Sequence, residues 1–198
     1  MSTNLTRRDA LRRLAVGGAA TAALPLWVEN LLAVADLHAQ HTPATTAAGS
    51  SWTPKVFDAH QNETVIVLSE LIIPETDTPG AKGARVNEYI DGVLADAPAG
   101  DRDMFVRGLT WLDEQSRQRY KRPFANAAPE QQVAFLTELS TTAEPAAELR
   151  RGAEFFTAIR AMTIAGYYTS EPGLLQEIGD PPSLFFTEFT GCTHPEHQ

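Results

Sequence analysis

The sequence lacks the short motifs by which many catalytic and cofactor-binding sites are recognised. It contains no Gly-x-Gly-x-x-Gly segment, no Walker loop, no Cys-x-x-Cys pair and no His-Glu-x-x-His segment. These absences remove the strongest sequence signals for dinucleotide binding, nucleotide hydrolysis and zinc-dependent hydrolysis. No stretch alternates apolar and polar residues for long enough to predict a β-strand. The sequence therefore offers little support for a self-sufficient enzyme.

Positive charge and cysteine are also scarce. The 198 residues include 16 Lys and Arg against 25 Asp and Glu, a formal net charge of −9, which argues against nucleic acid or an anionic membrane surface as a partner. Cys192 is the only cysteine, so no disulfide can form within one chain. The hydrophobic content of 43% is enough for one core, and a single folded domain is predicted.

The N-terminus has the layout of an export signal. Arg7 and Arg8 precede a short, weakly apolar run from Leu14 to Leu24, which is typical of a leader for the twin-arginine route. This run is much shorter than the roughly 20 residues needed to cross a bilayer. Two candidate cleavage sites with small residues follow, Ala33-Val34-Ala35 and Leu37-His38-Ala39.

The twin-arginine signal segment is predicted to cover residues 1–39, and the protein to reach the periplasm through the twin-arginine translocase, which usually exports cargo that has already folded. The residues that follow are rich in Ala, Thr, Ser and Gly and cannot pack, which predicts a flexible linker over residues 40–55. Two alternatives for the N-terminal segment stay open: an amphipathic helix of the mature protein, or an anchor that is retained uncut.

Apolar residues spaced by three and four recur through the rest of the chain and predict amphipathic helices. The first ends at Pro74, and a loop with Pro79 and Gly80 leads to the second. The last helix is the most hydrophobic and is expected to be central. The predicted fold is all-α, a bundle of about five helices within a domain over residues 56–198. The helices are expected at residues 57–73, 86–97, 101–122, 128–139 and 145–168, followed by an irregular aromatic tail.

A cluster of metal-ligating side chains lies near the C-terminus, where Cys192, His194 and His197 have the spacing Cys-x-His-x-x-His. A structural metal site usually needs a fourth ligand, and none is near in the sequence. Cys192 is otherwise either a buried small apolar residue or the partner of a cysteine in another chain. These readings stay open on the sequence alone.

Other polar and aromatic residues have simple structural interpretations. Glu75 and Asp77 could form an acid–base pair of carboxylates, but their place in a short loop without a pocket favours solvated loop acids. Tyr167 and Tyr168 precede a turn and suit packing in a core or an interface. Three residues of the tail are too apolar to remain in water and must cover the core or another subunit: Phe185, Phe186 and Phe189.

Four features occur together along nearly the whole chain. They are the leader, the segment Leu71-Ile72-Ile73-Pro74-Glu75-Thr76-Asp77-Thr78-Pro79-Gly80-Ala81, the turn Tyr167-Tyr168-Thr169-Ser170-Glu171-Pro172-Gly173 and the terminal Gly191-Cys192. With these features the chain resembles the gluconate 2-dehydrogenase subunit 3 family, the small or gamma subunits of membrane-associated flavin dehydrogenase complexes.

The resemblance implies a helical small subunit without catalytic, cofactor-binding or metal-binding residues of its own. Its partner would be a large flavoprotein of the glucose-methanol-choline type, which holds FAD, oxidises a sugar, polyol or sugar acid, and passes electrons to a cytochrome c subunit or a quinone. The small subunit would support assembly, stability and export of the large one. The alternatives are a metal-dependent oxidoreductase that uses the Cys/His cluster, and a free-standing helical binding protein.

The resemblance also indicates where the chain would meet its partner. The loop, the turn and the aromatic tail are expected to form the subunit interface, and Cys192 to be a candidate for an inter-subunit disulfide. The expected interface residues are Pro74, Glu75, Asp77, Pro79, Gly80, Tyr167, Tyr168, Glu171, Phe185, Phe186 and Phe189.

Overall fold

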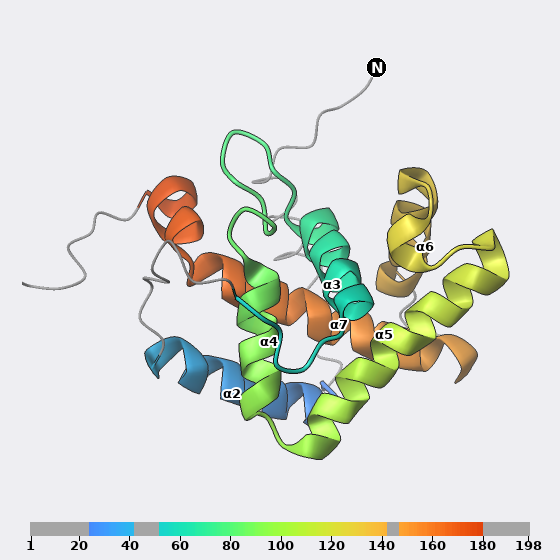
Figure 1. Cartoon of the computed structure of the whole chain (residues 1–198), viewed down its shortest axis with the longest axis horizontal. Coiled ribbons are helices and arrows are strands. Elements are labelled where there is room, and N and C mark those ends of the chain that lie inside the picture. The colour runs from blue at the N-terminus through green and yellow to red at the C-terminus, as the bar shows by residue number, and fades with distance from the viewer. Residues whose placement is uncertain (1–23, 42–51, 142–146, 180–198) are drawn as a thin grey trace, which may run out of the picture.

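The computed structural model describes residues 24–41, 52–141 and 147–179, and all regular structure within these ranges is helical (Figure 1). The all-α prediction is confirmed, and each of the five predicted helices is present within a few residues of its expected limits. None of the described helices is both long enough and apolar enough to cross a membrane. The α-helices are α2 (Leu26–His41), α3 (Ala59–Ile72), α4 (Val86–Asp96), α5 (Ala99–Tyr120), α6 (Pro129–Thr141) and α7 (Ala147–Tyr168), and the two short helices are η1 (Phe124–Asn126) and η2 (Pro172–Ile178).

Helix α7 lies at the centre of the fold, as its hydrophobic sequence predicts. It contacts α2, α3, α4, α5 and α6, and Figure 1 shows it crossing behind α3, α4 and α5. Phe155, Ile159 and Met162, spaced by four and three, are buried on α7. Helix α5 approaches closely because residue 108 is Gly: a Cβ at this position would lie 2.3 Å from the ring of Phe155. A larger residue at position 108 would force the two helices apart.

The chain enters α3 through a segment held by a buried carboxylate. Asp91 of α4 accepts hydrogen bonds of 2.7, 3.0 and 3.1 Å from the backbone N–H groups of residues 55–57. Asp58 then caps α3: its carboxylate accepts the backbone N–H of Gln61, and its own N–H donates to the Gln61 side chain. These bonds satisfy donors that precede or begin the helix, so the start of α3 is fixed against α4.

Helix α2 departs from the domain limits drawn from the sequence. The sequence places residues 26–41 in the signal segment and the start of the linker, whereas in the structure they form a helix in contact with α4, α5 and α7. Val28, Leu31 and Ala35 are buried in the common core. Since a leader and an amphipathic helix can share the same apolar spacing, the local sequence does not distinguish them. The folded part of the chain therefore starts before residue 56, and removal of a signal segment stays a prediction.

Candidate functional site: a composite loop–turn surface

The loop between α3 and α4 is folded around the carboxylate of Glu70. One oxygen of this carboxylate accepts the backbone N–H of Glu75 at 2.7 Å, and the other accepts the backbone N–H of Lys82 at 2.9 Å. Gly80 lies against the same carboxylate: a Cβ there would be 2.5 Å from the Glu70 Oε1 atom and from the Glu75 nitrogen. The loop thus has a defined shape that depends on a charge from α3 and on the absence of a side chain at residue 80.

The end of α7 and helix η2 hold this loop from the other side. The hydroxyl of Tyr167 donates to the carbonyl oxygen of Pro79 at 2.8 Å, and the hydroxyl of Thr78 donates to the carboxylate of Glu177 at 2.7 Å. Gly173 is required where η2 turns back over α7, because a Cβ there would lie 2.0 Å from the Tyr167 carbonyl oxygen. We call the resulting surface, residues 74–81 together with residues 168–178, the loop–turn surface.

The expected interface residues divide into exposed groups and buried supports. Pro74, Glu75, Asp77 and Glu171 are exposed, and Pro79 and Tyr168 are partly buried. Tyr167 and Gly80 are buried, so they shape the loop–turn surface and do not belong to its exposed area. The structure brings the loop and the turn together; Phe185, Phe186, Phe189 and Cys192 lie outside the described residues.

Sequence reasoning missed the apolar part of this surface. Leu175 and Ile178 of η2 are 42% and 56% exposed, and they follow directly on the turn that Tyr167 and Gly173 build. The sequence analysis predicts no helix over residues 172–178, because Pro172 and Gly173 there indicate the end of a helix. The loop–turn surface is therefore acidic at the loop and apolar at η2.

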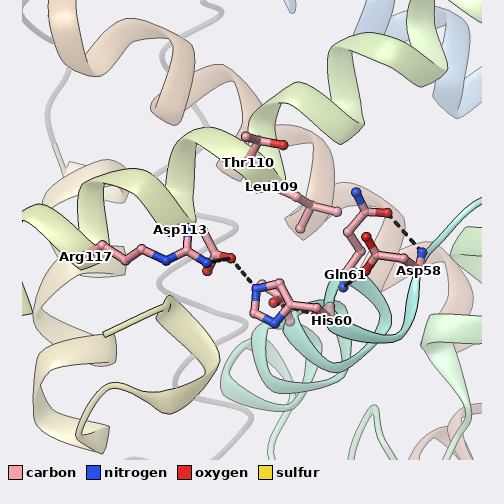
Figure 2. Close-up of a pocket in the computed structure, with 8 residues that line it drawn as sticks. Asp58, His60, Gln61, Leu109, Thr110, Asp113 and Arg117 are labelled. Atoms are coloured by element: carbon pink, nitrogen blue, oxygen red, sulfur yellow. Dashed lines mark hydrogen bonds and ion pairs between the residues drawn. The ribbon is translucent and has the colours of Figure 1, made fainter. Parts of the chain in front are cut away.

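A second cluster of polar groups surrounds Asp113 of α5, next to a hollow of about 200 Å³ (Figure 2). Asp113 is buried. One of its oxygens accepts the backbone N–H of Phe124 at 2.8 Å, and the other contacts Arg117 at 3.3 Å and pairs with the Nε2 atom of His60. The pairing joins α3, α5 and η1 through one carboxylate. Nothing in the local sequence links these residues, since His60 and Asp113 are 53 positions apart.

The geometry around Asp113 fits a structural cross-link better than an acid–base centre. A catalytic imidazole is normally oriented by a carboxylate and aimed at a nucleophile. The two lining hydroxyls of the hollow are engaged within their own helices: Thr64 donates to the carbonyl of His60, and Thr110 donates to the carbonyl of Val106. The carboxylate supplies the acceptor for a buried N–H group and two cationic or hydrogen-bonding side chains, which is sufficient reason for its burial.

The predicted export residues Arg7 and Arg8 lie outside the described residues, as do Cys192, His194 and His197, the side chains of the alternative metal site. Among the residues that are described, no group of three or more His, Cys, Asp or Glu side chains is arranged to hold a metal ion.

The described residues form a small all-helical protein whose loop–turn surface presents exposed acidic and apolar groups. The chain belongs to the gluconate 2-dehydrogenase subunit 3 family, because the model of that family matches residues 59–179, more than half of the chain. The matched part runs from the first residue of α3 through η2, and so includes both halves of the loop–turn surface. Comparison with curated proteins and with solved structures gave no match. The family is that of a subunit of an oxidoreductase complex.

Proposed function

We propose that this chain is the non-catalytic small subunit of a periplasmic, membrane-associated dehydrogenase complex that oxidises a sugar, polyol or sugar acid. The catalytic partner is a large flavoprotein that holds FAD, and a cytochrome c subunit accepts its electrons. The small subunit stabilises the large one and carries it through the twin-arginine translocase by means of the leader that contains Arg7 and Arg8.

The observation that carries this proposal is the family match over residues 59–179. The loop–turn surface supports it, because two segments about 90 positions apart are held together by Tyr167 and Thr78 to present exposed apolar and acidic groups. Such ordering of a surface loop has a conformational-entropy cost, which is offset when the ordered shape is what a partner recognises. The leader supports the export role, since a folded-cargo route suits a complex that assembles before it crosses the membrane.

The direct test is expression of the large flavoprotein with and without this chain, followed by measurement of flavin-dependent dehydrogenase activity in the periplasm. We expect activity in the periplasm only when both are present. Replacing Arg7 and Arg8 by Lys should abolish export of both subunits, because Lys keeps the charge and loses the guanidinium geometry. Export of the large subunit without this chain would refute the proposal.

The place of the interface is tested with matched substitutions of exposed apolar residues. Ile178 is 56% exposed on η2, and Val133 is 52% exposed on α6. In Figure 1, α6 and the red helix η2 lie on opposite sides of the molecule. Burial of an aliphatic side chain contributes about 1.5–3 kcal/mol, and an unpaired carboxylate in its place adds a desolvation penalty. We therefore expect Ile178→Asp to weaken association with the large subunit at least about tenfold, and Val133→Asp to leave it unchanged. Equal effects of the two substitutions would place the interface elsewhere.

A further inference from the structure

We propose that α2 is a permanent part of the protein, and that the cut that releases the leader falls before Leu24. The candidate sites after Ala35 and Ala39 are then not used, although their small residues suit a signal peptidase. The existence of the cut, and the order of folding and cleavage, rest on the export route proposed above; the structural role of α2 does not.

The first reason is the burial of α2. Val28, Leu31 and Ala35 are no more than 1% exposed, and the helix contacts α4, α5 and α7. A cut after Ala35 would remove all three residues from the core. The surfaces of α4, α5 and α7 that α2 covers would then face water. Even the truncation of one buried apolar side chain is strongly destabilising, and the loss of all three would cost more.

The second reason is the specificity of the contacts between α2 and α4. The imidazole of His38 pairs with the carboxylate of Asp96 at 3.0 Å and lies edge-on to the ring of Tyr89. It fits there because residue 92 is Gly: a Cβ would lie 2.8 Å from the ring atoms of His38. The hydroxyl of Tyr89 donates to the carbonyl oxygen of Ala35 at 3.2 Å. A leader that merely covers an apolar groove would not need a glycine, a carboxylate and an aromatic ring placed around one of its side chains.

A third contact joins the other half of α2 to α5. The side-chain amide of Asn30 donates to the carboxylate of Asp101 at 3.1 Å. Asn30 and His38 therefore join α2 to two different helices, and the buried apolar residues Val28, Leu31 and Ala35 lie beside and between these contacts. This pattern sets one register of α2 against the domain.

Because folding precedes cleavage, the packing of α2 determines which peptide bonds the signal peptidase can reach. A cargo of the twin-arginine route folds before it crosses the membrane, so the peptidase would meet α2 already packed. The peptide bonds after Ala35 and Ala39 lie within the helix Leu26–His41, and a helical, packed bond must unfold locally before a protease can bind it. The segment Ala20-Thr21-Ala22 lies upstream of α2 and offers small residues in the same spacing.

Intact mass spectrometry of the chain in the purified periplasmic complex tests the processing. We expect an N-terminus at or before Leu24, most simply at Ala23, and retention of all of α2. An N-terminus at any residue after Leu24, including Asp36 and Gln40, would overturn the proposal.

Thermal unfolding of the full, uncut chain tests the structural role of α2 independently of export. Leu31→Ala should lower the Tm by roughly 5 to 15 °C, because it leaves a cavity in the core. Leu37→Ala makes the same chemical change on the same helix at a residue that is 57% exposed, and should change the Tm by no more than about 2 °C. Equal Tm values for the two variants would overturn the proposal even if the chain is never exported. Failure of the large subunit to reach the periplasm would refute the proposed function and leave this comparison unaffected.

Discussion

Glu70 is the residue on which the shape of the loop–turn surface most directly depends. Its two carboxylate oxygens each accept one backbone N–H of the loop, at 2.7 and 2.9 Å. Glu70→Gln keeps the size of the side chain and its helix propensity but turns an amide N–H group toward one of these donors. A hydrogen bond to a charged acceptor contributes about 1.5–3 kcal/mol, and the lower end applies here because the side chain is partly exposed to water. We therefore expect Glu70→Gln to lower the free energy of unfolding by about 1.5–2 kcal/mol.

Urea-induced unfolding of the purified full chain measures this change. For a chain of this size the corresponding fall in Tm is about 3 to 8 °C. Glu63→Gln is the matched control, since Glu63 lies on the same helix and is exposed, so its substitution should change the free energy by less than about 0.5 kcal/mol. If the surface is the docking site, Glu70→Gln should also lower the yield of the complex with the large subunit. Equal stability of the two variants would refute the assignment of Glu70 as the organiser of the loop.

Three further predictions concern other buried or partly buried polar groups. The carboxylate of Asp91 accepts three consecutive backbone N–H groups, and Asp91→Asn replaces one of its acceptor oxygens. This substitution should lower the free energy of unfolding in urea by about 2–4 kcal/mol. Asp103→Asn, at an exposed position, should leave it unchanged. Burial, and secondarily the carboxylate of Asp36, raises the pKa of Tyr89 from 10.0 to about 12. The unfolded chain therefore loses this proton at a lower pH than the folded chain, so the free energy of unfolding should fall between about pH 10 and pH 12. Unfolding curves measured across this range should show a smaller pH dependence for Tyr89→Phe. Asp113→Ala should destabilise the chain by about 2–4 kcal/mol because it leaves a buried N–H group unpaired, while His60→Ala should leave the dehydrogenase activity of the assembled complex unchanged per mole of complex; a large loss of activity with normal assembly would assign His60 a chemical role.

The five central helices could be predicted because each has a local signal for its face and its end. Pro74 stops the first helix, and spacings of three and four mark the buried faces of the others, such as Phe155, Ile159 and Met162 on α7. Helix η2 was not predictable in this way, since Pro172 and Gly173 are typical of a helix end. The π-type turn there depends on the closeness of Gly173 to the carbonyl of Tyr167, a tertiary contact.

The candidate surface was predictable in its parts and not in its assembly. The loop and the turn could be singled out because their Pro and Gly residues interrupt apolar helices. The sequence does not predict the burial of Tyr167 and Gly80, or the two hydrogen bonds that Glu70 accepts from the loop. Both depend on which residues, distant along the chain, meet in space. The Asp113 cluster is a stronger case, because neither His60 nor Asp113 has a local signal that points to the other.

The sequence by itself determined the helical fold class, the order of the main helices, the acidic character and the resemblance to a dehydrogenase small subunit, because these properties follow from local periodicity, composition and short motifs. Only the tertiary structure decided that α2 packs against α4, α5 and α7 through Val28, Leu31 and Ala35, and that the loop and the turn form one surface. The physical reason is that burial and polar pairing depend on which helices meet in space. A stretch such as Leu31 to Ala35 has the same local pattern in a leader and in a core helix, and the contacts with α4, α5 and α7 distinguish the two.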